Sequence, residues 1–383
     1  MKRKILFAVV VVCALAPLFS IDFGGRISST TKYQGVNFSS LKWYESAKVH
    51  LWLTQQFNEN LRLSSDISYE FRYDQNADTI KNIIDVNLLK LTGTFHRRTA
   101  DTIEFGVGRF AVSDATGVVF NQVNDGIFAK VSVPAGSISA YAGITRLLNS
   151  HDAVILRQDS DTIVPTSSAK ALYVLGPKYI PLGFTLSLTP LFLNQTFTAE
   201  EWIFLDYSDD RYYRSFWTFM LSGPLARNVF YTASTTIGSE NLGTVSNLSK
   251  FALSYFPVKN ATVGFNALYA SGNNGSLSAF RGFTSQTAVL ATETVDFSTE
   301  YEGKLKFGVS GSYMIASRVY LGADCTVVFS CFDTLAYNGF QWQFNVMWNI
   351  FHDLQLSAGM YQYVAQKNEN NKTCFLLTGT FVF

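Results

Sequence analysis

Residues 60–73, NLRLSSDISYEFRY, alternate between apolar and polar side chains. The first set is apolar or aromatic and contains Leu61, Leu63, Ile67, Tyr69, Phe71 and Tyr73. The second set is polar or charged and contains Arg62, Ser64, Asp66, Ser68, Glu70 and Arg72. Successive side chains of a β-strand point to opposite faces, whereas a helix repeats about every 3.6 residues. The segment is therefore predicted to be a strand with one apolar face and one polar face.

The same period recurs to the end of the chain. It is clear in residues 340–350, where Phe, Trp, Val and Ile alternate with Gln, Asn and Met, and in residues 304–313 and 127–133. The phase slips near Leu88 and Leu89, because polar residues stand at odd positions before this point and at even positions after it. One β-bulge at this point restores the register.

The composition narrows the class of protein. Of 383 residues, 15% are charged and 15% are aromatic, and the formal net charge is +1. Low charge with high hydrophobicity excludes a disordered chain, and the lack of a basic excess argues against nucleic acid as a partner. A chain rich in aromatic residues, poor in charge and with a mean hydropathy of only +0.11 fits a transmembrane β-barrel. A soluble β-sandwich or β-propeller also alternates, but its water-exposed face usually carries more charge.

The first twenty residues form a separate segment. Lys2, Arg3 and Lys4 precede an apolar run over residues 5–19, which is shorter than the roughly 20 residues of a spanning helix. This pattern predicts a signal peptide over residues 1–20, cleaved after Ser20, and a barrel domain over residues 21–383. Removing three of 30 cations against 29 anions leaves a net charge of −2. A lipoprotein with Cys13 as the lipidated residue and a buried N-terminal helix are the alternatives.

The fold predicted from this periodicity is all-β, a transmembrane antiparallel up-and-down β-barrel of eighteen strands, with sixteen as the alternative. Short connections alternate with long ones, as periplasmic turns and extracellular loops do in outer-membrane barrels. We therefore expect a multi-pass protein of the bacterial outer membrane. The expected strands are 21–32, 46–56, 60–72, 83–96, 101–110, 126–134, 137–146, 168–177, 184–194, 211–222, 227–237, 247–256, 260–271, 303–315, 318–330, 338–350, 354–365 and 372–383.

The last expected strand carries the most specific signal. Phe375, Leu377, Gly379, Phe381 and Phe383 share one face. A final amphipathic strand that ends in Phe resembles the assembly signal of bacterial outer-membrane proteins, so the resemblance implies Phe381 and Phe383 as that signal and the barrel-assembly machinery as a partner. Together with the signal peptide, the whole chain resembles a porin-type barrel.

A narrower resemblance concerns two short motifs. Gly108-Arg109-Phe110, followed by Asp125-Gly126, is similar to a pattern in alginate-export and phosphate-porin-like barrels. It implies no particular substrate for this chain. Outer-membrane fatty-acid transporters are a second family that the chain resembles as a barrel, but they begin with an N-terminal plug, whereas strand-like alternation starts here at Ile21, so no plug is expected.

Charged residues within the strands are expected to face the lumen, because a charge on the lipid face costs roughly 2–4 kcal/mol near the midplane. Cations exceed anions among them, and charged rings set the selectivity of pores. We therefore expect a mild preference for anions or polar solutes. The alternative is that these charges pair across strands and stiffen the wall. The expected channel-lining residues are Lys48, Arg62, Asp66, Glu70, Arg72, Lys90, Lys130, Arg214, Lys304, Lys306, Arg318 and Asp324, with Glu104 beside them.

Two long loops are candidates for narrowing the channel. The loop 111–125 is unusually apolar, and Val118, Val119 and Phe120 suit a constriction that folds inward. The loop 272–302 is the longest and is expected to lie over the mouth. Exposed polar caps are the alternative, in which Phe280 and Phe283 pack only within their own loop.

No catalytic or cofactor-binding motif stands out. His50, His96, His151 and His352 are dispersed, so we expect no enzymatic activity, no cofactor and no metal. Cys331 and Cys374 are expected to be separate thiols, with a disulfide as the alternative. The pairs Glu200-Glu201 and Asp209-Asp210 are interpreted as a solvated acidic loop within residues 195–210.

These features together predict a function in transport. The protein is expected to be an outer-membrane channel for the diffusion of small hydrophilic solutes, with outer-membrane lipid around it and a homotrimer as one assembly open to it. The alternatives are a substrate-selective transporter for an apolar or oligomeric ligand and a surface-exposed adhesin or structural barrel.

Overall fold

The computed structural model describes residues 20–36, 38–75, 78–96, 101–149, 171–207, 213–273, 275–284, 301–332, 334–367 and 371–383. In these ranges the chain forms one sheet of eighteen strands. The strands are β1 (Ser20–Gly35), β2 (Lys42–Asn58), β3 (Leu61–Asp74), β4 (Thr79–His96), β5 (Thr102–Ser113), β6 (Asn121–Val133), β7 (Gly136–Ile144), β8 (Tyr179–Leu188), β9 (Thr196–Asp206), β10 (Tyr213–Ala226), β11 (Val229–Glu240), β12 (Thr244–Val258), β13 (Ala261–Ala270), β14 (Lys304–Ile315), β15 (Val319–Cys331), β16 (Leu335–Asn349), β17 (Leu354–Ala365) and β18 (Lys372–Val382). The predicted signal peptide lies outside the described residues, except for Ser20, with which β1 begins.

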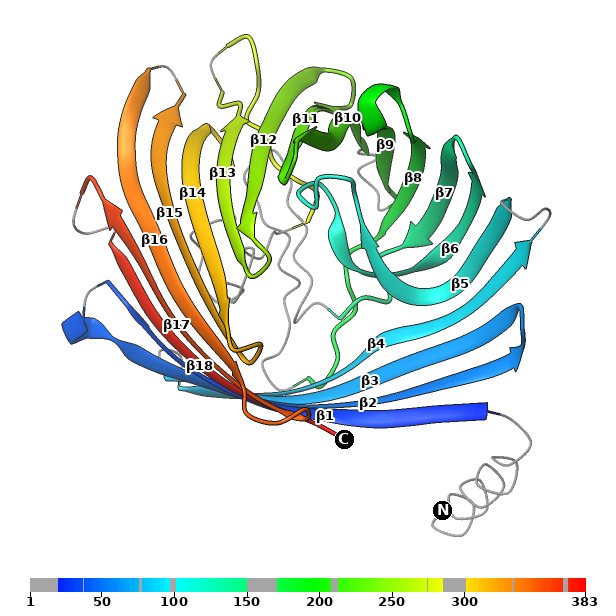
Figure 1. Ribbon diagram of the computed structural model, residues 1–383, viewed down its shortest axis with the longest axis horizontal. Coiled ribbons are helices and arrows are strands. Elements are labelled where there is room, and N and C mark those ends of the chain that lie inside the picture. Colours follow the sequence, from blue (N-terminus) through cyan, green and yellow to red (C-terminus); the bar gives the residue numbers. More distant parts are fainter. Residues whose placement is uncertain are drawn as a thin grey trace.

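The sheet closes on itself as an up-and-down barrel (Figure 1). Each strand pairs antiparallel with the next one, and β1 pairs with both β2 and β18. At the closing seam, Arg26 lies opposite Val382 on one side and opposite His50 on the other. The prediction of eighteen strands is confirmed, and the alternative of sixteen is wrong.

The two faces of the wall differ as the alternation predicts. Leu51, Ile67 and Val309 point outward and are exposed by 57%, 51% and 56%, whereas their neighbours His50 and Ser68 point inward and are buried. An apolar outer face with a polar inner face is the arrangement of a transmembrane barrel. Within the described ranges, no helix has both the length and the apolar character that a membrane crossing requires.

The predicted β-bulge is present in β4. Between β3 and β4 the register shifts at Asp66 and Ile67, which lie opposite Leu88 and Val86, so Asn87 is the extra residue. An extra residue moves the side chains that follow it to the other face. This explains why the polar residues of β4 change from odd to even positions.

Three boundaries around β8 and β9 differ from the expected ones. Residues 171–177 are not a strand; they contain one isolated bridge, between Asn149 and Leu175. The stretch between the expected strands 168–177 and 184–194 is not a turn, because β8 begins at Tyr179 and ends at Leu188. The expected loop 195–210 instead contains β9, in which Trp202 and Phe204 point inward. Because the inner face of β9 is also apolar at these positions, apolar and polar residues do not alternate there. The strand therefore could not be recognised from a period of two.

The β5–β6 hairpin leaves the wall halfway along its length. β4 pairs with β5 only as far as Leu89 and Arg109, and β6 pairs with β7 only as far as Asp125 and Ile144. Beyond these positions β5 and β6 stay paired with each other alone. The free part of β4 bonds instead to the segment at 172, where the Ile84 N–H donates to the Leu172 carbonyl at 3.2 Å. The end of the hairpin therefore turns into the barrel (Figure 1).

Candidate functional site

The loop at the tip of this hairpin is organised by one carboxylate. Asp114 is buried, and its Oδ1 accepts hydrogen bonds from the backbone N–H groups of Val119 at 2.9 Å and Phe120 at 2.8 Å. Its Oδ2 accepts hydrogen bonds from the backbone N–H and the hydroxyl of Thr116, at 2.8 and 2.5 Å. Because one side chain accepts hydrogen bonds from three backbone amides, the apolar tip is held in a defined shape.

The apolar tip packs against the inner wall. Val118, Val119 and Phe120 are exposed by 2%, 0% and 0%. The ring of Phe120 lies 5.0 Å from that of Trp202 and 5.3 Å from that of Phe204, both on β9. The three residues expected to form a constriction therefore lie inside the barrel, within its main cluster of buried apolar side chains.

A second loop segment completes this cluster. Phe280 and Phe283 are fully buried, and the ring of Phe283 stacks on Phe204 with 3.7 Å between centroids. The Phe283 N–H donates to the carbonyl of Val119 at 2.8 Å. The described part of the loop 272–302 therefore packs against the hairpin tip and the wall, and not only within itself.

Arg214 on β10 fastens this second segment. It is 3% exposed, forms an ion pair with Glu240 at 2.6 Å and donates to the carbonyls of Arg281 and Gly282 at 2.6 and 3.2 Å. The charge of Arg214 therefore holds the second loop segment against the wall, and Arg214 does not line the channel as expected.

Two further charged groups, neither of them expected at this site, bind the hairpin tip. Glu200 on β9 accepts hydrogen bonds from the Ala115 N–H at 2.6 Å and from the Thr185 hydroxyl at 3.0 Å. Lys250 on β12 donates to the carbonyl of Thr116 at 2.9 Å. Glu200 belongs to a strand, so its interpretation as part of a solvated loop is wrong, while Asp209 and Asp210 lie outside the described residues. A Glu-Glu pair at the start of an alternating aromatic run was the only available signal.

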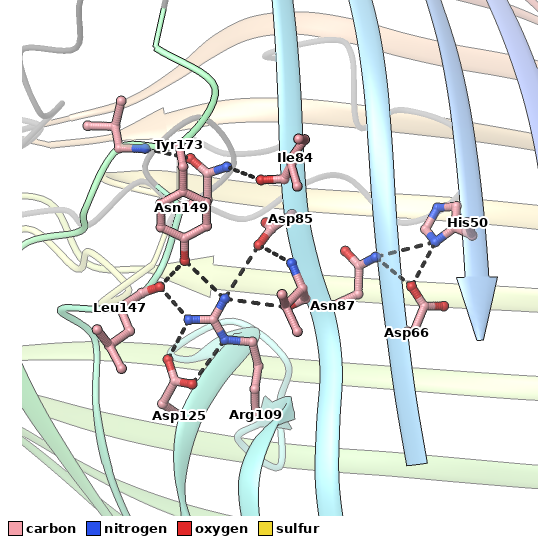
Figure 2. Close-up of polar contacts among 12 residues, drawn as sticks. His50, Asp66, Ile84, Asp85, Asn87, Arg109, Asp125, Leu147, Asn149 and Tyr173 are labelled. Atoms are coloured by element: carbon pink, nitrogen blue, oxygen red, sulfur yellow. Dashed lines mark hydrogen bonds and ion pairs between the residues drawn. The ribbon is translucent and has the colours of Figure 1, made fainter. Parts of the chain in front are cut away.

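Arg109 lies at the branch point of the hairpin (Figure 2). It forms two hydrogen bonds with Asp125, at 3.0 and 2.7 Å, and reaches Asp85 at 3.5 Å. It also donates to the Tyr173 hydroxyl at 3.0 Å, and this hydroxyl donates to the carbonyl of Leu147. Burial raises the pKa of Tyr173, so the phenol stays protonated. The Gly-Arg-Phe and Asp-Gly motifs thus meet in space.

The backbone at this branch requires a glycine. Gly108 has φ +124°, and a Cβ there would lie 2.0 Å from the carbonyl oxygen of Leu89. Only glycine accepts both this conformation and this close approach.

A second polar cluster lines the wall beside the bulge (Figure 2). His50 Nδ1 lies 3.1 Å from Asp66 Oδ1, and Arg26 lies 3.1 Å from the other ring nitrogen. The amide of the bulged residue Asn87 donates to Asp66 at 2.6 Å. The bulge therefore brings Asn87 into one cluster with Asp66 and His50.

The other expected lining residues fall into several environments. Glu70 contacts both Lys48, at 3.6 Å, and Arg72. Lys90 lies over the Phe128 ring at 4.4 Å, and Lys306 lies over the Tyr301 ring at 5.3 Å. Arg62 and Lys130 are exposed, Lys130 is paired in register with Glu104, Lys304 begins β14, and Asp324 accepts a hydrogen bond from Thr326 at 3.2 Å. Arg318 differs from the expectation, because it lies exposed in the turn before β15.

The three cysteines in the described part of the chain are separate thiols. Cys325, Cys331 and Cys374 take part in no disulfide, so the alternative of a Cys331–Cys374 disulfide is wrong. Among the described residues, no three His, Cys, Asp or Glu side chains are grouped in a way that would hold a metal ion.

Comparison with known proteins defines the class of fold. No family model and no curated sequence matches the chain. A BenF-like porin from Pseudomonas fluorescens Pf-5 has a similar structure, with a TM-score of 0.63, 10% identity and coverage of 95% of this chain and 98% of that one. OpdL and OpdQ of Pseudomonas aeruginosa give TM-scores of 0.62 and 0.60, each with 12% identity and coverage of 95% of this chain and 99% of the other. The fold is that of a porin-type β-barrel.

Proposed function

We propose that the protein is an outer-membrane channel through which small hydrophilic solutes diffuse. The observation that carries this proposal is solvent contact at the middle of the inner wall. The side chains of Lys48 and Asp66 lie well inside β2 and β3 and are 27% and 23% exposed. The packed tip and second loop occupy the side of β8–β12, opposite these residues in strand order. Water that reaches the polar wall provides a path for solutes.

The charges on this wall support a mild preference for anions. Glu70 is shared by two cations, Lys48 and Arg72. Arg62 and Lys130 add exposed positive charge near the turns of the neighbouring hairpins. Positive charge that lines a pore raises the local concentration of anions. The channel-lining set proposed here is the expected one without Arg214, which is used for packing, and Arg318, which lies in a turn.

The cellular setting belongs to the same proposal. The signal peptide over residues 1–20 directs export, and the last strand, with Phe381 and Phe383 on its outer face, is the segment recognised during assembly into the outer membrane. The apolar residues exposed along the outer wall then face lipid. Buried Val118, Val119 and Phe120 act as the constriction, and a homotrimer is the assembly we expect.

The test is the single-channel conductance of the refolded protein in a planar bilayer. Folding is established first, by the change in electrophoretic mobility on heating. Discrete conductance steps that grow with salt concentration are expected, together with a reversal potential of the anion-preferring sign under a salt gradient. A folded barrel that conducts nothing would overturn the channel, and a cation-preferring reversal potential would overturn the selectivity.

A further inference from the structure

Arg26 on β1 is an inward cation that the expected set of channel-lining residues did not contain. Phe23 and Ile27 point outward and are exposed by 79% and 46%. Side chains alternate along a strand, so Arg26, which is out of phase with them, points into the barrel. It is in register with His50 on β2, whose side chain also points inward. Arg26 is exposed, so its guanidinium is accessible from the lumen.

The hydrogen bonds of His50 fix which ring nitrogen carries the proton. Arg26 Nη2 lies 3.1 Å from His50 Nε2, and a guanidinium can only donate. Nε2 is therefore the acceptor, which leaves the proton of the neutral ring on Nδ1. Nδ1 lies 3.1 Å from Asp66 Oδ1 and donates to it, because an ionised carboxylate can only accept. Figure 2 shows the ring beside Asp66, with the amide of Asn87 as a second donor to this carboxylate at 2.6 Å.

Charged groups on four strands surround this neutral ring. They are Arg26 on β1, Lys48 on β2, Asp66 and Glu70 on β3, and Asp85 on β4. Lys48 is paired with Glu70 at 3.6 Å, and Asp85 reaches Arg109 at 3.5 Å. The imidazole itself contacts one cation, Arg26, and one anion, Asp66.

A second proton on His50 would enter at Nε2, the nitrogen that holds Arg26. A protonated imidazole donates at both nitrogens, so the hydrogen bond from Arg26 is lost and two positive charges face each other. The bond from Nδ1–H to Asp66 becomes a contact between ions and is strengthened. The ring therefore stays with Asp66, and the guanidinium of Arg26 turns away from the wall toward the lumen.

We propose that Arg26 is a specificity-determining residue of the channel and that His50 is its positioning residue. The proposal rests on the proposed channel function. While His50 is neutral, it holds the guanidinium against the wall. Once His50 is protonated, the released guanidinium and the new imidazolium both add positive charge to the lumen. Positive charge that lines a pore favours anions, so the preference for anions increases on acidification.

The test is the reversal potential under a salt gradient, measured on the protein isolated from membranes. The pH is lowered from about 7.5 to about 5, the range over which an imidazole ordinarily changes its charge. For the wild type, the ratio of anion to cation permeability is expected to rise about twofold, the effect of one more charge near a screened, water-filled path.

Two variants separate the roles of the two residues. His50→Gln keeps an acceptor for Arg26 and a donor for Asp66 but takes up no proton. Its permeability ratio is expected to match the wild type at neutral pH and to show no rise in acid. Arg26→Gln is expected to lower the ratio at neutral pH and to keep only a smaller rise, from the charge of His50 itself. His352→Gln, in the exposed turn between β16 and β17, is the matched control and should leave the rise unchanged.

NMR of the protein with isotope-labelled histidine tests the geometry without any conductance. The His50 signals, identified by their loss in His50→Gln, are expected to show a proton on Nδ1 at neutral pH and a cationic ring at about pH 5. A proton on Nε2 at neutral pH, a ring that stays neutral in acid, or a rise in the ratio that persists in His50→Gln would overturn the proposal. A folded protein with the expected signals and no conductance would overturn the channel function instead, and would leave the pairing of His50 with Arg26 standing.

Discussion

Arg109 and Asp125 are joined by two parallel hydrogen bonds, 3.0 and 2.7 Å long, at the point where β5 and β6 leave the wall. The pair is largely buried, with side-chain exposures of 8% and 19%. A two-point contact between guanidinium and carboxylate fixes orientation as well as distance. It therefore holds the base of the hairpin whose tip lies in the lumen.

Arg109→Gln is expected to lower the free energy of unfolding by about 3 kcal/mol or more, because removing one partner leaves the Asp125 charge buried and uncompensated. Urea titration of the protein in lipid vesicles measures this loss. Arg109→Lys is the control: it keeps the charge but not the two-point geometry, so a smaller loss is expected. Equal stability of Arg109→Gln and the wild type would show that the pair does not hold the hairpin.

Asp114→Ala is expected to loosen the hairpin tip. The buried amides of Val119 and Phe120 lose their acceptor, and each unpaired group costs about 1–3 kcal/mol. A tip that no longer packs against the wall leaves more room for ions, so single-channel conductance should rise and its fluctuations should increase. Asp114→Asn keeps one acceptor oxygen, so its conductance is expected to lie between those of the wild type and Asp114→Ala. Unchanged conductance in Asp114→Ala would contradict the role of the tip as a constriction.

Phe120→Ala tests the packing of the same tip from its apolar side. The ring contacts Trp202 and Phe204 and is fully buried. Truncating a buried Phe to Ala costs about 3–5 kcal/mol, and the vacated volume should raise conductance. Stability from urea titration and conductance from bilayer recordings are compared on the same preparation. A large loss of stability with wild-type conductance would show that the Phe120 ring stabilises the fold but does not narrow the channel.

Gly25→Ala is expected to weaken the closing seam between β1 and β18. A Cβ at Gly25 would lie 2.3 Å from the Phe383 ring, although the two backbones bond to each other at 2.8 and 2.9 Å. The Phe383 ring is 57% exposed and can turn aside, so a cost at the low end of the about 1–3 kcal/mol of overpacking is expected, with a slightly lower fraction of refolded, heat-modifiable barrel. Gly311→Ala is the matched control, because nothing lies within 4 Å of a Cβ there. A similar loss in both variants would argue against a specific effect at the seam.

Arg62→Glu combined with Lys130→Glu is expected to move the reversal potential toward cation preference. Both side chains are exposed and stand at inward positions of β3 and β6. Lys259→Glu, in the turn between β12 and β13, makes half the charge change outside the lumen and should have little effect. A comparable shift in the turn variant would show that overall charge, and not the charge on the inner wall, sets selectivity.

The success of the sequence-based predictions depended on which face of each strand was polar. Where an apolar face meets lipid and a polar face meets the lumen, as in β3, alternation identified the strand and also the bulge in its neighbour β4. In β9 the inner face is aromatic and the outer face carries Glu201, so both faces departed from the pattern. Position along the chain alone also suggested that Arg214 lines a channel, whereas the structure uses its charge against Glu240 and the second loop.

The sequence by itself determined the closed eighteen-stranded barrel and the apolar character of loop 111–125, because a period of two and an apolar run are local properties. Only the tertiary structure decided what enters the lumen. The hairpin turns inward because β5 and β6 lose their neighbours at Arg109 and Asp125, and its tip is held by Glu200 and Lys250, residues far away in the chain. Contacts between distant segments depend on register and closure, which no local pattern encodes.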